Sequence, residues 1–289
     1  MNKEYFKYII SLLIFGTNGI IAGFIPLSSA QIVWSRTILG SLALAVVFLI
    51  KRQKPQLKIM IKEWKWMLAS GVSMGANWVF LFESYRHMGV SLATLANYCG
   101  PVLVIALSPL IFKEKPMAAI YLGVVAVATG MVMVNYSGIE NMGGIVGLIC
   151  GIGAAISYAS MIITNKKIKG VSGLEVTLAQ LVISMFVVGV YVLLSGGEVA
   201  PLKLSEIGAV IFLGVVNTGI ACYMYFSSLR SLNANTVAIC SYIDPTSAII
   251  FSAIILSEKL DIVQIIGAVL VLCGACFASF YSNRKKQTP

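Results

Sequence analysis

Long apolar stretches alternate with short polar segments along the whole chain. Ten stretches of about 20 residues are nearly free of charge, and they cover 5–23, 30–50, 66–85, 90–112, 117–136, 144–164, 176–195, 207–228, 234–256 and 262–281. A helix needs about 20 apolar residues to cross the roughly 30 Å hydrocarbon core of a bilayer. The stretches lack the ten-residue alternating pattern of a membrane β-barrel. The pattern therefore predicts an all-α integral membrane protein with ten transmembrane helices.

The composition agrees with this interpretation and excludes a soluble protein. Hydrophobic residues make up 58% of the 289-residue chain and charged residues 11%. A soluble domain carries about 25% charged residues. One soluble core cannot hold so many apolar side chains, so the surplus has to face lipid. The segments between the stretches are short, which leaves no room for a separate soluble domain.

The basic residues predict the orientation in the membrane. If the chain crosses the bilayer ten times, 17 of the 21 Lys and Arg residues lie on one side of the membrane. Three lie on the other side, namely Arg86, Lys203 and Lys259, and Arg36 lies inside a span. Such an excess marks the cytoplasmic side. We therefore expect a multi-pass plasma-membrane protein with both termini in the cytoplasm. The net charge of +10 reflects this topology, so no nucleic-acid partner is expected. The 51–65 segment is expected to lie against anionic lipid.

An internal repeat appears when the chain is shifted by 144 residues. Positions 71–136 then align without gaps with 215–280, and 16 of 66 positions are identical. The identities include Arg86/Arg230, Tyr98/Tyr242, Pro101/Pro245, Glu114/Glu258, Lys115/Lys259, Gly123/Gly267 and Gly130/Gly274. We predict two five-helix repeats over 1–138 and 139–289. Because five is odd, the second repeat enters the bilayer from the opposite side, and inverted repeats of this kind are typical of secondary transporters.

These residues resemble the EamA-type family of the drug/metabolite transporter superfamily. The resemblance covers nearly the whole chain, and it includes Arg36 early in the second span and the turns Phe112-Lys113-Glu114-Lys115-Pro116 and Leu256-Ser257-Glu258-Lys259-Leu260. Position 180, which corresponds to Arg36 in the second repeat, is Gln. The resemblance implies a carrier of amino acids, their metabolites or other small organic solutes, often moved outward. It does not select the substrate.

Two prolines at matching places predict where the transport site lies. Pro101 and Pro245 each fall near the middle of a predicted span. A proline inside a helix cannot donate a hydrogen bond to the carbonyl four residues earlier, so the carbonyls of Asn97 and Ser241 are expected to be free. Interrupted helices at matching positions are a pointer to a transporter site and its hinges. The alternative is a packing kink whose free carbonyl bonds a neighbouring helix.

Asp244 is the most informative single residue. It lies about ten residues from either end of its predicted span, hence near the middle of the bilayer. An ionised carboxylate there is costly unless it is paired or hydrated. We therefore expect a proton acceptor for ion coupling or a counter-ion to a substrate ammonium group. A neutral Asp bonded to a neighbouring helix is the structural alternative.

Glu83 is a second candidate for proton coupling. It lies within about two turns of the outer end of its span. The simpler interpretation is an ion pair with Arg86 three residues on. Arg36 also lies near the outer end of its span, where its side chain is expected to extend to the interface.

Further polar and aromatic residues at membrane depth are expected to line one central cavity. Their aromatic rings suit a flat or cationic solute. The predicted substrate-binding residues, besides Asp244, are Asn18, Asn77, Trp78, Asn97, Tyr98, Tyr158, Asn217, Tyr223, Ser241 and Tyr242.

The prediction is thus a non-enzymatic secondary transporter that exports an amino acid or related metabolite by alternating access. No cofactor and no metal are expected, and the oligomeric state stays open. The alternatives are an importer or exchanger of small amines or metabolites, a membrane-embedded enzyme and a non-transporting scaffold. The enzyme is disfavoured because the sequence has one His and none of the common metal-binding or nucleophile motifs.

Overall fold

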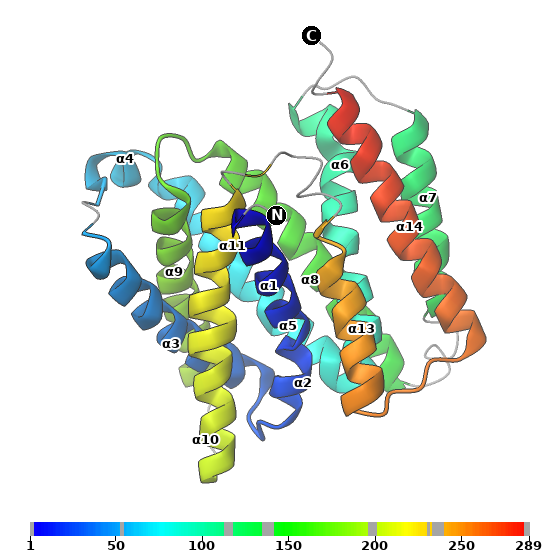
Figure 1. The fold of residues 1–289 in the computed structure, drawn as a ribbon, viewed down its shortest axis with the longest axis horizontal. Coiled ribbons are helices and arrows are strands. Elements are labelled where there is room, and N and C mark those ends of the chain that lie inside the picture. Colours follow the sequence, from blue (N-terminus) through cyan, green and yellow to red (C-terminus); the bar gives the residue numbers. More distant parts are fainter. Residues whose placement is uncertain are drawn as a thin grey trace.

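The computed structural model describes residues 3–52, 55–112, 118–134, 142–195, 201–229, 232 and 240–285. Among these residues it contains helices and connecting segments but no strand (Figure 1). The all-α prediction is confirmed for this part of the chain. The helices are α1 (Lys3–Gly16), α2 (Asn18–Gly23), α3 (Ser29–Ile50), α4 (Leu57–Lys62), α5 (Trp64–Asn97), α6 (Cys99–Phe112), α7 (Ala118–Val134), α8 (Met142–Lys167), α9 (Gly173–Leu194), α10 (Leu204–Ile211), the π-helix η1 (Phe212–Ile220), α11 (Ala221–Leu229), α13 (Ile243–Ile255) and α14 (Ile262–Lys285).

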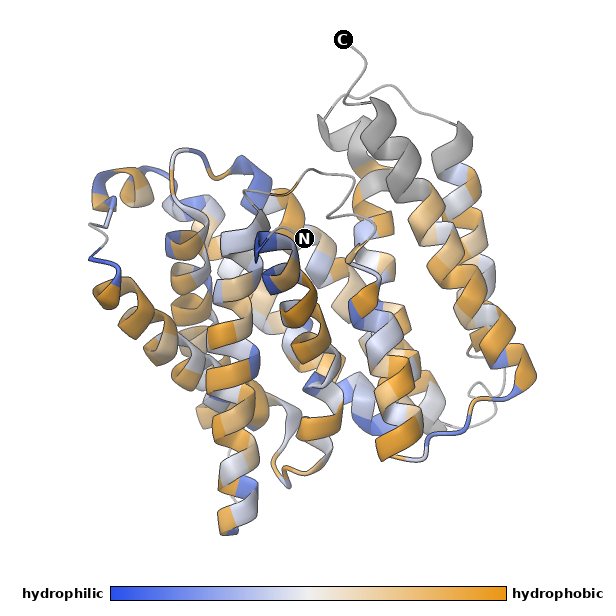
Figure 2. Cartoon of the chain, in the orientation of Figure 1, coloured by the Kyte–Doolittle hydropathy of each residue, from blue (hydrophilic) through white to orange (hydrophobic). Residues whose placement is uncertain are grey.

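Five helical segments are long and apolar enough to cross a membrane. They are Lys3–Gly23, Ser29–Ile50, Gly144–Lys167, Gly173–Leu194 and Leu204–Tyr225, and three shorter apolar helices accompany them, Tyr121–Val134, Ile243–Ile255 and Ile262–Phe277. Hydrophobic residues cover most of the helix lengths, whereas hydrophilic residues gather near helix ends and connections (Figure 2). Large apolar side chains point away from the protein, with Leu194 82% and Ile50 75% exposed. Such surfaces suit lipid rather than water.

The helix ends sort into two groups. α1 begins, and α3, α8 and α14 end, toward one end of the molecule, where α4 also lies (Figure 1). The α2–α3 connection, the start of α10 and the α13–α14 connection lie at the opposite end (Figure 1). α1 thus begins toward the same end of the molecule at which α14 ends (Figure 1).

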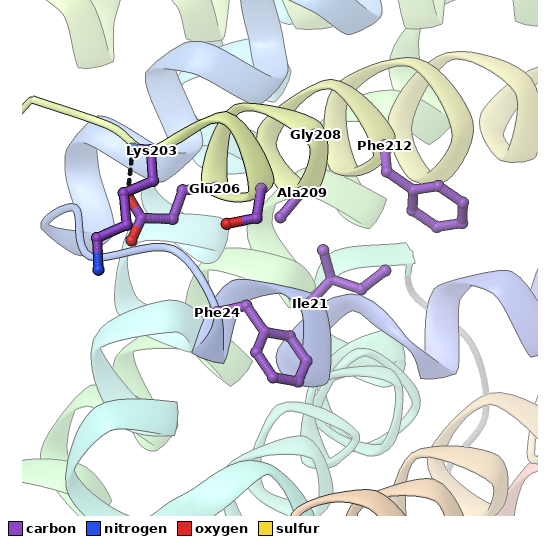
Figure 3. Close-up of a pocket in the computed structure, with 8 residues that line it drawn as sticks. Ile21, Phe24, Lys203, Glu206, Gly208, Ala209 and Phe212 are labelled. Atoms are coloured by element: carbon purple, nitrogen blue, oxygen red, sulfur yellow. Dashed lines mark hydrogen bonds between the residues drawn. The ribbon is translucent and has the colours of Figure 1, made fainter.

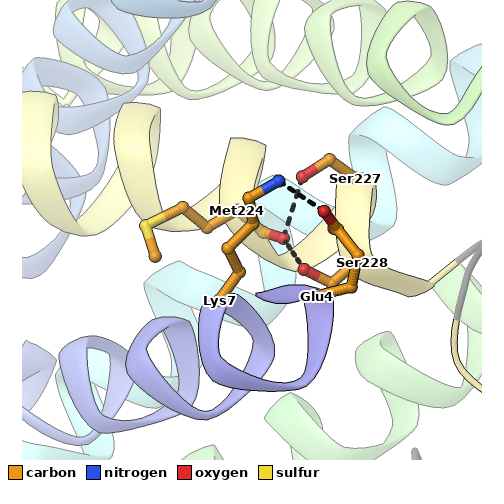
Figure 4. A network of polar contacts seen from close by, with 5 residues as sticks. All are labelled: Glu4, Lys7, Met224, Ser227 and Ser228. Atoms are coloured by element: carbon orange, nitrogen blue, oxygen red, sulfur yellow. Dashed lines mark hydrogen bonds and ion pairs between the residues drawn. The ribbon is translucent and has the colours of Figure 1, made fainter. Parts of the chain in front are cut away.

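Polar side chains within the helices find local partners. At the start of α1, Lys7 Nζ lies 2.8 Å from Glu4 Oε1. In α11, the hydroxyls of Ser227 and Ser228 donate to the carbonyl oxygen of Met224 at 3.1 and 2.7 Å (Figure 4). Polar groups in an apolar surrounding need such partners.

Helices α7 and α14 cross at glycines. A Cβ on Gly130 would lie 2.6 Å from the carbonyl oxygen of Gly267, and one on Gly274 would lie 2.9 Å from that of Gly123. The 144-residue repeat relates these two contacts to each other, because Gly130 corresponds to Gly274 and Gly267 corresponds to Gly123. Only residues without a Cβ allow backbones to approach this closely.

The helices are interrupted at matching positions near the predicted prolines. α5 ends at Asn97 and α6 begins at Cys99, and a turn at Ser241 and Tyr242 precedes α13. Pro101 and Pro245 are each the third residue of a new helix, where no backbone N–H is needed. The predicted interruptions are present, but they do not lie at the prolines themselves. The break lies three to four residues before each proline, and the proline stands in the first turn of the next helix.

A second correction concerns the predicted outer loop at 86–89. Helical structure continues through it, and α5 joins two predicted spans across the non-helical Gly89, whose φ is 81° and ψ 169°. This backbone conformation is essentially restricted to glycine. It turns the chain sharply without separating the two helical segments by a loop.

Candidate functional site

The interrupted helices bring Tyr98 and Asp244 together. The Tyr98 hydroxyl donates to Asp244 Oδ2 at 2.5 Å, across 146 positions of the chain. Tyr98 follows the last residue of α5, and Asp244 lies in the first turn of α13. Both side chains are partly exposed. The carboxylate therefore sits beside a helix break, with one oxygen bonded and its surface incompletely covered.

Aromatic rings surround this pair, and we call the group the Asp244 site. The rings of Tyr8 and Tyr225 have centroids 5.3 Å apart. Tyr8 and Tyr225 pack with Ile243, the residue before Asp244, and the Tyr158 ring lies against Gly100, two residues after Tyr98. A carboxylate bounded by ring faces and phenol hydroxyls is suited to an organic cation.

Close packing fixes the position of this site. A Cβ on Gly100 would lie 2.8 Å from the Tyr158 ring, so the missing side chain makes room for that ring. A Cβ on Gly16 would meet the Ser247 hydroxyl of α13. This contact holds α1 against the first turns of α13, next to Asp244.

Arg36 forms a second group of contacts, which we call the Arg36 site. Its side chain is only 2% exposed. Nε donates to Thr218 Oγ1 at 3.0 Å and Nη2 to Asn18 Oδ1 at 3.3 Å. The guanidinium carbon lies 4.2 Å from the centroid of the Trp78 ring and 5.2 Å from that of Phe82. The expectation that Arg36 extends to the interface was wrong, because its partners hold it inside the protein.

Asn217 connects this site to the break between α1 and α2. Its amide Nδ2 lies 2.8 Å from Ile14 O, 2.9 Å from Thr17 Oγ1 and 3.2 Å from Asn18 Oδ1. The hydroxyl of Thr218, the next residue, donates to Leu213 O at 2.8 Å, and both residues lie in the π-helix η1. Irregular helices of this kind are frequent at functional sites. The predicted site residues Asn18, Trp78 and Asn217 are therefore brought together here.

Other predicted residues lie elsewhere. Asn77 and Asn97 are buried and bond each other at 2.7 Å, and Asn77 also donates to Ala154 O, so this pair joins helices. The Tyr223 ring lies 4.8 Å from Lys51 Nζ. Tyr242 packs against the apolar cluster of α7 and α14. Ser241 lies in the turn before α13 and is partly buried.

Glu83 lies apart from both sites. Its Oε2 accepts from Ser29 Oγ at 2.6 Å, and its Oε1 lies 3.2 Å from His87 Nε2. The side chain is 36% exposed. No ion pair joins it to Arg86 among the described residues, so the expected pairing was wrong and His87 takes that place.

Glu258 has a role that sequence analysis missed. Its Oε1 accepts from the backbone N–H of Val90 at 2.6 Å, and its Oε2 from Ser91 N at 3.1 Å and Ser91 Oγ at 2.7 Å. The carboxylate thereby caps the helical segment that follows Gly89. The duplicated Glu-Lys motif was the available signal, but its partner is 167 residues away.

Two cavities open on the surface. One of about 660 Å³ lies between α2 and the start of α10 and is lined by Ile21, Phe24, Lys203, Ser205, Glu206, Gly208, Ala209 and Phe212 (Figure 3). It contains none of the predicted site residues. The second, of about 540 Å³, is lined by residues that include Gly19, Ile32, Phe82, Tyr85 and Glu258. Because Phe82 also contacts Arg36, this second cavity reaches the layer of side chains next to the Arg36 site.

A comparison with known protein families divides the chain at about the same place as the sequence repeat. The sequence model of the EamA-like transporter family matches residues 2–136 and again 145–280. The uncharacterized transporter YxxF of Bacillus subtilis (strain 168) is 27% identical over 273 residues, covering 93% of this chain and 86% of that protein. The uncharacterized inner membrane transporter YhbE of Escherichia coli (strain K12) is 21% identical over 296 residues, covering 93% and 91%. One solved structure, 15% identical, matches 97% of this chain and 99% of its own with a TM-score of 0.69, which shows a shared fold.

Proposed function

The chain belongs to the EamA-like transporter family, and from this membership we propose that it is a secondary transporter that exports a small organic solute by alternating access. The solute is an amino acid or a related metabolite, and the direction follows the family resemblance. Ten transmembrane helices form two inverted repeats, 1–138 and 139–289. The protein lies in the plasma membrane with both termini in the cytoplasm.

Several observations support the inverted repeat. The family model matches the two parts of the chain separately. The helix breaks at Tyr98 and Tyr242 are 144 residues apart, as the sequence repeat requires. The Gly130–Gly267 and Gly123–Gly274 approaches exchange under the same shift. A two-fold axis in the membrane plane accounts for all three, because it relates each helix to an antiparallel copy.

The Tyr98–Asp244 bond is the observation that carries the proposal. It joins the two repeats at two broken helices, and both side chains remain partly exposed. In transporters, the ends of interrupted helices form the substrate site near the bilayer midplane. We assign Asp244 the role of binding the ammonium group of the solute or taking up the coupling proton, with Tyr98 orienting the carboxylate.

Movement of the two repeats then exposes this site to either side. The breaks before Pro101 and Pro245 are the proposed hinges, because helix continuity is already lost there. The 540 Å³ cavity beside Phe82 and Glu258 is the proposed outer path. We place coupling at Asp244 rather than at Glu83, which is one-third exposed and bonded to Ser29 and His87.

Transport by purified protein in proteoliposomes tests the proposal. Uptake and counterflow of radiolabelled amino acids and amines are measured with and without a pH gradient. Asp244→Asn is compared with Asp261→Asn, an exposed carboxylate that only bonds Gln264 N at the start of α14. We expect Asp244→Asn to lose transport or its pH dependence and Asp261→Asn to keep both. Normal transport with unchanged pH dependence in Asp244→Asn would show the assigned role to be wrong.

A further inference from the structure

Arg36 has no carboxylate partner in the described part of the chain. No carboxylate among the described residues lies within 4 Å of the guanidinium, and the side chain is 2% exposed. A cation held inside a membrane protein is costly when no opposite charge neutralises it. The hydrogen bonds to Thr218 and Asn18 are made with neutral oxygen atoms and leave that charge in place.

Part of the hydrogen-bonding capacity of Arg36 is also unused. Nε and Nη2 have acceptors among the described residues, whereas Nη1 and the second hydrogen of Nη2 have none. The edge formed by Nη1 and Nη2 is the one that binds a carboxylate with two parallel bonds. The ring of Trp78 covers a face of the guanidinium.

The amide side chain of Asn217, which shares Asn18 as a partner with Arg36, also has a polar atom without a hydrogen bond among the described residues. Asn217 is fully buried, and its Oδ1 has no hydrogen-bond partner in the described part of the chain. A buried acceptor without a donor is unfavourable. This oxygen suits a donor on a bound solute, such as an ammonium or hydroxyl group, next to an anion held by Arg36.

From these observations we propose that Arg36 binds a carboxylate group of the transported solute. The inference rests on the proposed transport function and restricts it, since it excludes amines that lack an acid group. The solute comes within reach from the 540 Å³ cavity, whose lining includes Phe82 and Gly19, once the Phe82 ring moves aside.

The position of the Asp244 site agrees with such a solute. Gly16 of α1 touches Ser247 of α13. Asn18, an Arg36 partner, lies two residues beyond Gly16, and Asp244 lies three residues before Ser247. Asn18 and Asp244 therefore both lie close in the chain to the contact between α1 and α13. A solute with an acidic and a basic group finds opposite charges at similar depth.

The test compares acids with their amides. Leucine, phenylalanine and threonine and their carboxamides are assayed in proteoliposomes as competitors and as transported solutes. The carboxamide keeps the size and the ammonium group but loses the negative charge. The difference between two charge-assisted bonds to the acid and two neutral bonds to the amide corresponds to about a 10- to 100-fold preference for the acid in the wild type. We expect Arg36→Gln to reduce this preference to near unity while amide binding changes little.

Controls separate a binding role from a structural one. Arg52→Gln removes an exposed guanidinium outside the 540 Å³ cavity and is expected to keep the preference. Arg36→Lys keeps the charge without the two-bond edge, so it is expected to retain a reduced preference. Loss of protein stability alone would lower acid and amide transport together and leave their ratio unchanged.

The possible results distinguish this inference from the proposed transport function. Two results with the wild type would contradict the inference but not the proposed transport function. They are equal transport of amides and acids, and transport of amines without transport of acids. Neither result depends on whether an Arg36 variant folds. An Arg36→Gln variant with an unchanged acid-to-amide ratio contradicts it as well. A wild type that carries nothing in the panel contradicts the proposed substrate class and, with it, this inference.

Discussion

The contact between Glu258 and the helical segment after Gly89 leads to a quantitative prediction. Glu258→Ala removes an acceptor carboxylate from Val90 N, Ser91 N and Ser91 Oγ at once. The two backbone N–H groups lie at the start of a helical segment and have no partner in the preceding turn. Glu258→Gln removes the charge and one of the two acceptor oxygens but keeps the other.

The expected loss of stability follows from these three bonds. A hydrogen bond to a charged group contributes about 1.5–3 kcal/mol when buried. Glu258 is half-buried, so water replaces part of each bond in the variant. About 1 kcal/mol for each bond gives a destabilisation of about 3 kcal/mol for Glu258→Ala. The corresponding change for Glu258→Gln is about 1–2 kcal/mol.

Thermal unfolding of the purified protein in detergent measures the effect. At about 2 °C per kcal/mol for a chain of this size, Glu258→Ala is expected to lower Tm by about 6 °C. Glu206→Ala is the matched control, because Glu206 is also half-buried but accepts one bond within its own helix cap, from Lys203 N. Its expected effect is about 1 kcal/mol.

Hydrogen exchange adds a local measurement. In Glu258→Ala, exchange at Val90 and Ser91 should accelerate more than in α9, which is capped independently by Ser172. If Glu258→Ala lowers Tm no more than Glu206→Ala does, and exchange at these two amides is unchanged, the assigned capping role is wrong.

Three further predictions concern packing and the Asp244 site. Gly130→Ala is expected to destabilise by about 1–3 kcal/mol, since its Cβ meets Gly267 O at 2.6 Å. Gly208→Ala in α10 has open space at its Cβ and gains the helix propensity of Ala, so it is expected to be neutral or to stabilise by up to about 1 kcal/mol; Tm measures both. Asn77→Ala removes two buried bonds and is expected to lower stability by about 2 kcal/mol or more, measured in the same way. Tyr98→Phe removes one hydrogen bond to a carboxylate, so it is expected to lower Tm by only about 2 °C and to lower transport. Tyr191→Phe, 59% exposed and away from the site, is expected to keep both; equal transport by the two variants would contradict the site.

The repeat was a useful guide to where the site is symmetric and where it is not. The shift by 144 predicted the matched helix breaks near Pro101 and Pro245, although it placed them a few residues too far along. It did not predict how charge is distributed. Position 180, which corresponds to Arg36, is a Gln that bonds Ser70, and position 100, which corresponds to Asp244, is Gly. The proposed site therefore draws one charge from each half.

The helical class, the apolar segments and the family follow from the sequence alone, because each depends on local composition or on repeated motifs. Transfer into lipid is roughly additive over a segment of about 20 residues, so the pattern reports it directly. The sequence does not indicate which helix faces pack against each other. The α3 residues are apolar on nearly all sides, and nothing in that pattern indicates that Arg36 turns inward. Only the packed structure places it against Trp78 and Thr218, and Glu258 against Val90, because these contacts depend on how helices far apart in the chain rotate and cross.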